Sequence, residues 1–149
     1  GLGKAAELAA AAMAERAGRM AALRDRLIDG LLRSVDHVLL SGSRGQRLPH
    51  QASFFVRFVE GEAMLLSLDM KGFACSSGSA CTSKALKASH VHLAMGFDHA
   101  TAQGSLVFSL LDTTTAADIE ALIAAFPPTI DRLRKMSPLY TEFLKERTP

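Results

Sequence analysis

The sequence predicts an α+β fold in which a short, mostly antiparallel sheet is covered by helices and a long helix leads into it. Two observations carry this prediction. Residues 1–32 are rich in helix formers with apolar residues at helical spacing, and short runs of β-branched and aromatic residues lie farther on, between loops rich in glycine and serine. The length of 149 residues, with 48% hydrophobic and 21% charged residues, is typical of one globular domain.

The leading helix is predicted over residues 4–32, where Leu23, Leu27 and Leu31 recur on one side. Gly18 lies inside this stretch and costs about 1 kcal/mol relative to alanine. We therefore expect one long amphipathic helix that is weakened near its middle.

Two strands are predicted next. Residues 37–40 form a short apolar run followed by a loop of glycine, serine and arginine. Residues 52–59 are richer in β formers, and Phe54, Val56 and Phe58 alternate with the residues of the other face. Both runs are therefore expected to join the sheet.

Helices dominate the remainder of the chain. Thr115 can cap one that carries apolar residues on one face, and we expect Pro127 and Pro128 to break or restart it, because proline lacks an amide donor and clashes with the preceding turn. The other predicted elements are a helix over 62–70 capped by Gly72, a brief strand over 73–75, a helix over 89–95, a turn capped by Asp98, a strand over 106–110 and a last helix over 138–145.

A run of very small side chains surrounds Cys81. A thiol in such a loop suits a nucleophile that attacks at one site and delivers at another, and a following helix with Lys84 and Lys87 can favour the reactive thiolate. A buried cysteine acting as a small hydrophobe is the alternative, and composition alone does not choose between them. The candidate site residues are Ser76, Ser77, Gly78, Ser79, Ala80, Cys81, Thr82 and Ser83.

Cys75 and three histidines are further candidates near this loop. Cys75 can serve as a resolving or disulfide partner for Cys81, but an apolar strand residue is better explained as a packed free thiol. His90, His92 and His99 are candidate proton carriers, although surface or cap positions explain them equally well.

Charge and hydropathy exclude several classes of protein. The 17 basic residues are interleaved with 15 acidic ones, so no nucleic-acid partner is expected. No apolar run approaches the ~20 residues of a membrane-spanning helix, and the amino terminus lacks a secretory signal pattern. The cysteines and histidines do not follow zinc-site spacing, so no metal is expected. We expect a cytoplasmic protein.

The loop 76–83 is one of several motifs that point to a family. The others, in chain order, are Gly1-Leu-Gly-Lys-Ala5, Glu60-Gly-Glu-Ala63, Lys71-Gly72, Ser89-His90-Val91, Ala94-Met95-Gly96 and Met136-Ser-Pro-Leu139. Together they closely resemble the cysteine desulfurases, which are class V aminotransferases that supply sulfur for iron–sulfur clusters. The resemblance covers essentially the whole chain, and the combination is highly specific.

This resemblance implies the carboxy-terminal small domain of a pyridoxal-phosphate-dependent transferase of fold type I. Residues 1–32 would be the linking helix and residues 33–149 the α+β domain with the catalytic loop. The large domain that binds pyridoxal phosphate (PLP) is absent from the chain and would act in cis or in trans, so no cofactor is expected on this chain alone, which is predicted to be inactive by itself. Complete relatives are homodimers.

The resemblance also implies the chemistry. In these enzymes the sulfur of L-cysteine passes to the loop cysteine, here Cys81, as a persulfide, and L-alanine is released. An iron–sulfur scaffold or another acceptor protein then takes the sulfur.

Three positions depart from the family pattern. Val107 matches an arginine that binds the substrate carboxylate in relatives, and an isopropyl group cannot perform that role. Leu111 replaces a glycine and His50 an asparagine.

Three functions therefore stay open: part of a cysteine desulfurase, a non-enzymatic module that carries persulfide or docks a scaffold, and a degenerate structural fragment. We favour the first, with Cys81 as the nucleophile.

Overall fold

The computed structural model describes residues 1–78 and 88–147. Within these ranges a three-stranded antiparallel sheet has the order β1-β2-β3. The strands are β1 (Val38–Leu40), β2 (Gln51–Val56) and β3 (Ser105–Ser109). Phe54 of β2 lies opposite both Leu40 and Leu106, so the central strand fixes the register of the whole sheet. The predicted α+β class is confirmed.

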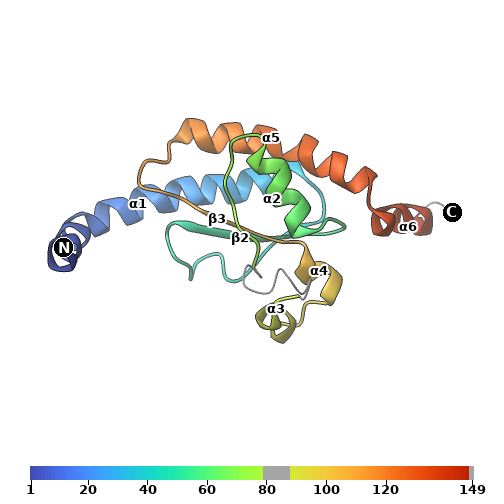
Figure 1. Cartoon of the computed structure of the whole chain (residues 1–149), viewed down its shortest axis with the longest axis horizontal. Helices are drawn as coiled ribbons and strands as arrows, with labels where there is room; N and C mark the ends of the chain where they lie inside the picture. The colour runs from blue at the N-terminus through green and yellow to red at the C-terminus, as the bar shows by residue number, and fades with distance from the viewer. Residues whose placement is uncertain (79–87, 148–149) are drawn as a thin grey trace.

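Helices cover this sheet (Figure 1). The long helix α1 and helix α5 run side by side over one face, with α2 beside them, whereas α3 and α4 lie at the other side of the sheet. The helices are α1 (Leu2–Ser34), α2 (Gly61–Asp69), α3 (His90–Ala94), α4 (His99–Gln103), α5 (Ala116–Lys135) and α6 (Pro138–Arg147).

The core forms where β2 meets α1 and α5. Phe54 is fully buried in one cluster with Leu27 and Leu31 of α1 and Phe126 of α5. Phe55 points to the opposite face and is also fully buried, because the elements around α3 cover it. Burial of large apolar side chains on both faces of β2 makes this strand the centre of the fold.

The helix ends follow the expected signals. Thr115 and Asp118 form a reciprocal capping box at the start of α5, and the Asp98 carboxylate accepts a hydrogen bond of 2.7 Å from the amide of Thr101 in α4. Gly72 has a φ of +85°, the left-handed conformation of a glycine that ends a helix. These three predictions are confirmed.

One predicted strand is shorter than expected, and another is not a strand. The second strand ends at Val56 because Phe58 has a φ of +69° and turns the chain toward α2, although the alternation continues to Val59. The stretch 73–75 is not a strand, since only the next residue, Ser76, pairs with β3.

The prediction that Pro127 and Pro128 break their helix was also wrong. Both prolines lie inside the continuous helix α5. Phe126 and Ile130 flank them and are fully buried in the core. Tertiary packing against α1 and α2 therefore outweighs the cost of about 3 kcal/mol that an interior proline imposes.

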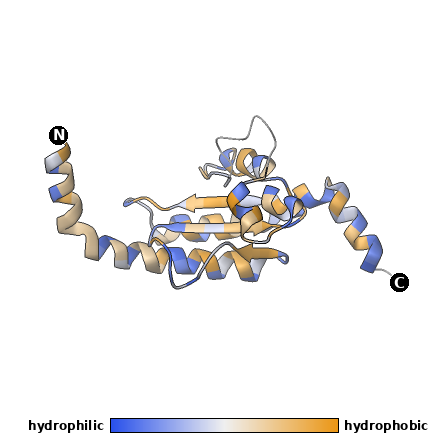
Figure 2. Cartoon of the chain, turned by 90° about the horizontal axis from the view of Figure 1, so that it is seen from below, coloured by the Kyte–Doolittle hydropathy of each residue, from blue (hydrophilic) through white to orange (hydrophobic). Residues whose placement is uncertain are grey.

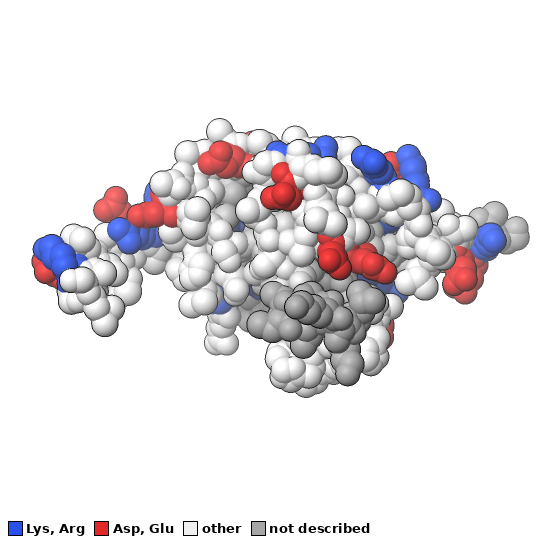
Figure 3. Space-filling view, viewed as in Figure 1, with Lys and Arg blue, Asp and Glu red and all other residues white. Residues whose placement is uncertain are grey.

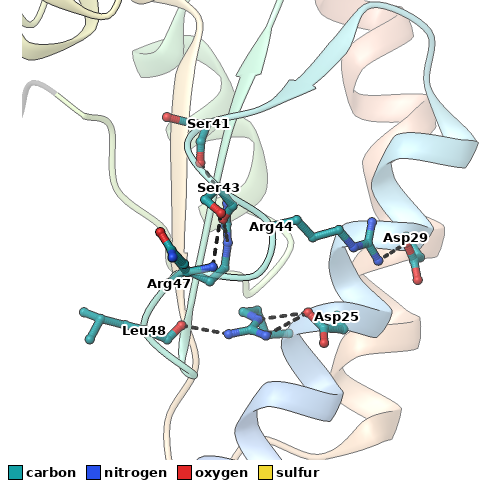
Figure 4. Close-up of polar contacts among 9 residues, drawn as sticks. Asp25, Asp29, Ser41, Ser43, Arg44, Arg47 and Leu48 are labelled. Atoms are coloured by element: carbon teal, nitrogen blue, oxygen red, sulfur yellow. Dashed lines mark hydrogen bonds and ion pairs between the residues drawn. The ribbon is translucent and has the colours of Figure 1, made fainter.

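The loop between β1 and β2 is held against α1 by arginines (Figure 4). The buried guanidinium of Arg24 donates to the carbonyl of Leu48 at 3.1 Å, and Arg44 lies 2.5 Å from the Asp29 carboxylate. Arg47 donates to two carbonyls of its own loop. These contacts fix the point from which β2 begins.

The two ends of the chain extend away from this body (Figure 2). The first half of α1 exposes Leu2, Leu8 and Met13, whereas its second half is buried against the core. Lys and Arg are interspersed with Asp and Glu over the face that Figure 3 presents. No helix within the described residues has the length and hydropathy needed to cross a membrane.

Candidate functional site

The segment that leads toward Cys81 is attached to the free edge of β3. Ser76 and Val107 form an isolated antiparallel bridge in which each backbone amide donates to the other residue's carbonyl, at 2.9 Å and 2.7 Å. Two residues later the amide of Gly78 donates to the Oγ of the buried Ser105 at 3.1 Å. Three hydrogen bonds therefore fix residues 76–78 on the strand before the chain reaches residue 79.

Gly78 lies in a narrow space. A Cβ added there would lie 3.0 Å from the Oγ of Ser105 and 3.2 Å from the Nε2 of His92, and closer still to the Cε1 of His92. Gly61, the first residue of α2, is similarly confined, because a Cβ would lie 2.8 Å from the carbonyl oxygen of Ser105. The two glycines let α2 and the segment 76–78 approach the start of β3 together.

Among the three histidines that follow the loop, His92 is the one that contacts this segment. Its ring packs edge-on against Phe55 with a centroid distance of 4.7 Å, and its Nδ1 atom is buried without a hydrogen-bond partner among the described residues. Burial lowers the pKa of His92 below its ordinary value of 6.5. His90 and His99 are exposed. The structure thus distinguishes His92 among residues that the sequence left equivalent.

Cys75 is a packed thiol, as predicted. It is half-buried against the hydrophobic core and has no disulfide. Burial, with a smaller effect from the Asp69 carboxylate, raises the pKa of Cys75 to about 11. Cys75 therefore remains a protonated, weakly nucleophilic thiol at neutral pH.

The predicted site residues are only partly placed. Ser76, Ser77 and Gly78 occupy the positions described above. Ser79, Ala80, Cys81, Thr82 and Ser83 lie outside the described residues, as do Lys84 and Lys87. The role of Cys81 thus stays a prediction that the geometry of the preceding residues does not test.

Val107 occupies the middle of β3 at the base of this segment. Its backbone pairs with Ser76 on one side, and it faces Ser53 of β2 on the other. Its half-buried side chain is apolar and cannot bind a carboxylate. Ser105, two residues earlier, holds Gly78, and sequence reasoning missed it because a single serine at the start of a strand carries no signal of such a contact.

The described residues do not form a site that suits PLP. The lysines among them, Lys4, Lys71, Lys135 and Lys145, are all exposed on the surface. The two buried arginines, Arg24 and Arg134, donate to backbone carbonyls. Neither a buried lysine nor a free buried cation is therefore present in residues 1–78 and 88–147 to hold the cofactor. The same part of the chain contains no group of three His, Cys, Asp or Glu side chains that could bind a metal ion.

Comparisons with known proteins place this geometry in a family. The sequence model of the Aminotransferase class-V family matches residues 1–122. Cysteine desulfurase IscS 1 of Archaeoglobus fulgidus is 45% identical over 140 residues, which are 94% of this chain and 36% of that protein. Cysteine desulfurase IscS of Clostridium botulinum is 42% identical over 149 residues, which cover 99% of this chain and 38% of that protein.

A solved structure shows the same fold. The NifS-like protein of Rickettsia africae superposes with a TM-score of 0.72 at 27% identity, over 83% of this chain and 31% of that one. The chain thus spans little more than a third of the length of the curated relatives above. It belongs to the aminotransferase class-V family.

Proposed function

We propose that this chain is the sulfur-accepting part of a cysteine desulfurase, and that Cys81 receives the sulfur of L-cysteine. The observation that carries the proposal is the similarity to cysteine desulfurases over 94% and 99% of the chain. In the reaction the Cys81 thiol and L-cysteine give L-alanine and a Cys81 persulfide, so the sulfur atom of the substrate passes from its Cβ carbon to the sulfur of Cys81. An acceptor thiol then takes the outer sulfur and leaves Cys81 as a thiol again.

The contacts of the residues before Cys81 are consistent with this role. Three hydrogen bonds join residues 76–78, which precede the thiol-bearing residues in the sequence, to β3. Cys75, six residues earlier, does not compete for sulfur, because its raised pKa of about 11 keeps it protonated. This pattern suits one reactive thiol that follows the anchored residues 76–78.

The remainder of the enzyme belongs to the proposal as well. Residues 1–32 act as the linking helix and residues 33–149 as the small domain, with PLP held by a large domain outside this chain, in cis or in trans. The cofactor would supply the electron sink for breaking the carbon–sulfur bond of cysteine. The complete protein would be a cytoplasmic homodimer that delivers sulfur to an iron–sulfur scaffold or another acceptor protein.

A second function is favoured by one residue. Val107 cannot form the paired contact that a guanidinium makes with the carboxylate of an amino acid. A module that only carries persulfide, or only docks a scaffold, would not need that contact. Such a chain would accept sulfur at Cys81 from a persulfide donor and release no alanine.

Reconstitution tests both functions. The chain is mixed with the large domain of a related cysteine desulfurase, PLP and L-cysteine, and alanine is measured for the wild type, Cys81→Ser and the matched control Cys75→Ser. The desulfurase proposal expects alanine from the wild type and Cys75→Ser but not from Cys81→Ser. Full turnover by Cys81→Ser would overturn the nucleophile assignment.

Val107→Arg separates the two functions further. If the missing guanidinium limits the binding of cysteine, this variant should lower KM for cysteine with little change in kcat. No alanine from either the wild type or Val107→Arg, together with sulfur on Cys81 after treatment with a small persulfide donor, would favour the carrier function.

A further inference from the structure

Residues before and after positions 79–87 meet at one contact. Gly78 is the last described residue before residues 79–87, and α3 begins at His90, after residues 88 and 89. The ring of His92 on α3 lies against Gly78, so that a single added methyl group would collide with its Cε1. The same ring rests on Phe55, whose side chain is fully buried in β2. His92 therefore connects α3 to Gly78 and to the sheet.

We propose that His92 is a positioning residue whose uncharged imidazole clamps Gly78, and with it residues 76–78 that lead toward Cys81, onto the sheet. The inference rests on the proposed function only for the purpose of the clamp, namely to hold the sulfur-accepting thiol in register with the rest of the enzyme. The clamp consists of His92 on α3, Gly78 before positions 79–87, Ser105 on β3 and Phe55 on β2.

The surroundings of the ring explain why the imidazole must be uncharged. The described partners from β2, from residues 76–78 and from β3 are Phe55, Gly78 and Ser105, none of which carries a charge. His90 is the other titratable residue of α3, and Asp98 and His99 lie at the start of α4, which packs against α3; all three are exposed. Because Nδ1 is buried without a partner, a proton there would create an N–H donor with no acceptor.

The sign of the pH effect follows from burial. Burial, and no described charge, lowers the pKa of His92 in the folded protein. The clamp is thus at full strength above the ordinary histidine pKa of 6.5 and weakens as the pH falls below it, until the lowered pKa is passed.

Amide hydrogen exchange of the full chain measures the clamp directly. Protection of the Gly78 and Ser76 amides, corrected for intrinsic exchange rates, is compared at about pH 7.5 and about pH 5.5 in the wild type, His92→Leu and the control His90→Leu. Leucine keeps an apolar contact with Phe55 but cannot titrate. Protection is expected to fall about threefold or more toward acid pH in the wild type and in His90→Leu, and to stay constant in His92→Leu. The same acid dependence in all three proteins would overturn the proposal.

A double-mutant cycle tests the contact itself. Gly78→Ala should reduce the protection of the Ser76 amide in the wild type, because the new Cβ displaces the His92 ring. In a His92→Ala background the ring is gone, and the same substitution should have a clearly smaller effect. Equal effects in both backgrounds would mean that the contact with His92 does not hold residues 76–78.

These measurements require no turnover of cysteine, so their outcome is independent of the proposed function. If the clamp is found but Cys81→Ser keeps full turnover, the clamp stands and its stated purpose fails. If Cys81 accepts sulfur but amide exchange at Gly78 does not depend on His92, the desulfurase proposal stands and the clamp fails.

Discussion

Gly30 lies where α1 crosses α5, and replacing it by alanine should destabilise the fold although alanine is the better helix former. A Cβ at this position would lie 2.7 Å from Cγ1 and 3.2 Å from Cγ2 of Ile123, and closer to Cδ1. Because both branches of the β-branched side chain are in the way, rotating only its end gives no relief, and χ1 must change or the helices must separate. Overpacking of this kind costs about 1–3 kcal/mol, and helix propensity offsets about 1 kcal/mol of it. We expect a net loss of about 1 kcal/mol in the free energy of unfolding.

Gly18 provides the matched control on the same helix. Apart from its chain neighbours and the backbone of its own helix, no atom lies within 4 Å of a Cβ built there, so Gly18→Ala should raise the free energy of unfolding by about 0.5–1 kcal/mol. Urea denaturation of the full chain, followed by circular dichroism, measures both variants against the wild type. Opposite signs are expected. If Gly30→Ala stabilises the chain as much as Gly18→Ala does, the close packing of α1 on α5 described above is wrong.

Three further predictions concern buried polar groups. Arg134→Leu removes the donor to two backbone carbonyls of neighbouring loops and should lower the free energy of unfolding by about 3 kcal/mol in urea denaturation. The control Arg132→Leu, at an exposed position, should change this free energy by less than about 0.5 kcal/mol. Equal effects of the two substitutions would contradict the role of Arg134. Because the pKa of the Cys75 thiol rises from 9.0 to about 11, its thiolate is rarer at about pH 8, although each thiolate is more nucleophilic; alkylation of Cys75 in Cys81→Ser should therefore be about tenfold slower than in the unfolded chain, and equal rates would refute its burial. The same raised pKa means that Cys75 stabilises the fold fully below pH 9.0 and loses this contribution as the pH rises toward about 11, so the urea midpoint should fall there in Cys81→Ser but not after Cys75→Ala is added.

Local signals in the sequence predicted most of the elements. Leu27 and Leu31 recur at helical spacing and are fully buried on α1, and the caps at Gly72 and Thr115 depend only on neighbouring residues. The helix break at the prolines was predicted wrongly because contacts with distant parts of the chain determine the local structure there. Pro128 stays inside α5 because α1 and α2 hold the buried residues around it, and no property of the proline itself indicates that support.

At the candidate site, too, local sequence signals were informative, and contacts between distant residues were not predictable. The small residues around Cys81 predicted a reactive loop, and the resemblance of several motifs to one family predicted its role in sulfur transfer. The anchors of the loop were not predictable, because Gly78 meets Ser105 across 27 positions in the sequence. His92 could not be separated from His90 or His99 by spacing, since what distinguishes it is contact with Gly78 and Phe55.

Mapping of sulfur on the chain is the most direct test of the proposed function. After the reconstituted protein has turned over L-cysteine, the chain is digested without reductant, and the peptides that contain Cys75 and Cys81 are weighed by mass spectrometry. We predict that the Cys81 peptide gains the mass of one sulfur atom and that the Cys75 peptide does not. Alanine release with the added sulfur on Cys75, or on neither cysteine, would contradict the assignment of Cys81 as the sulfur acceptor.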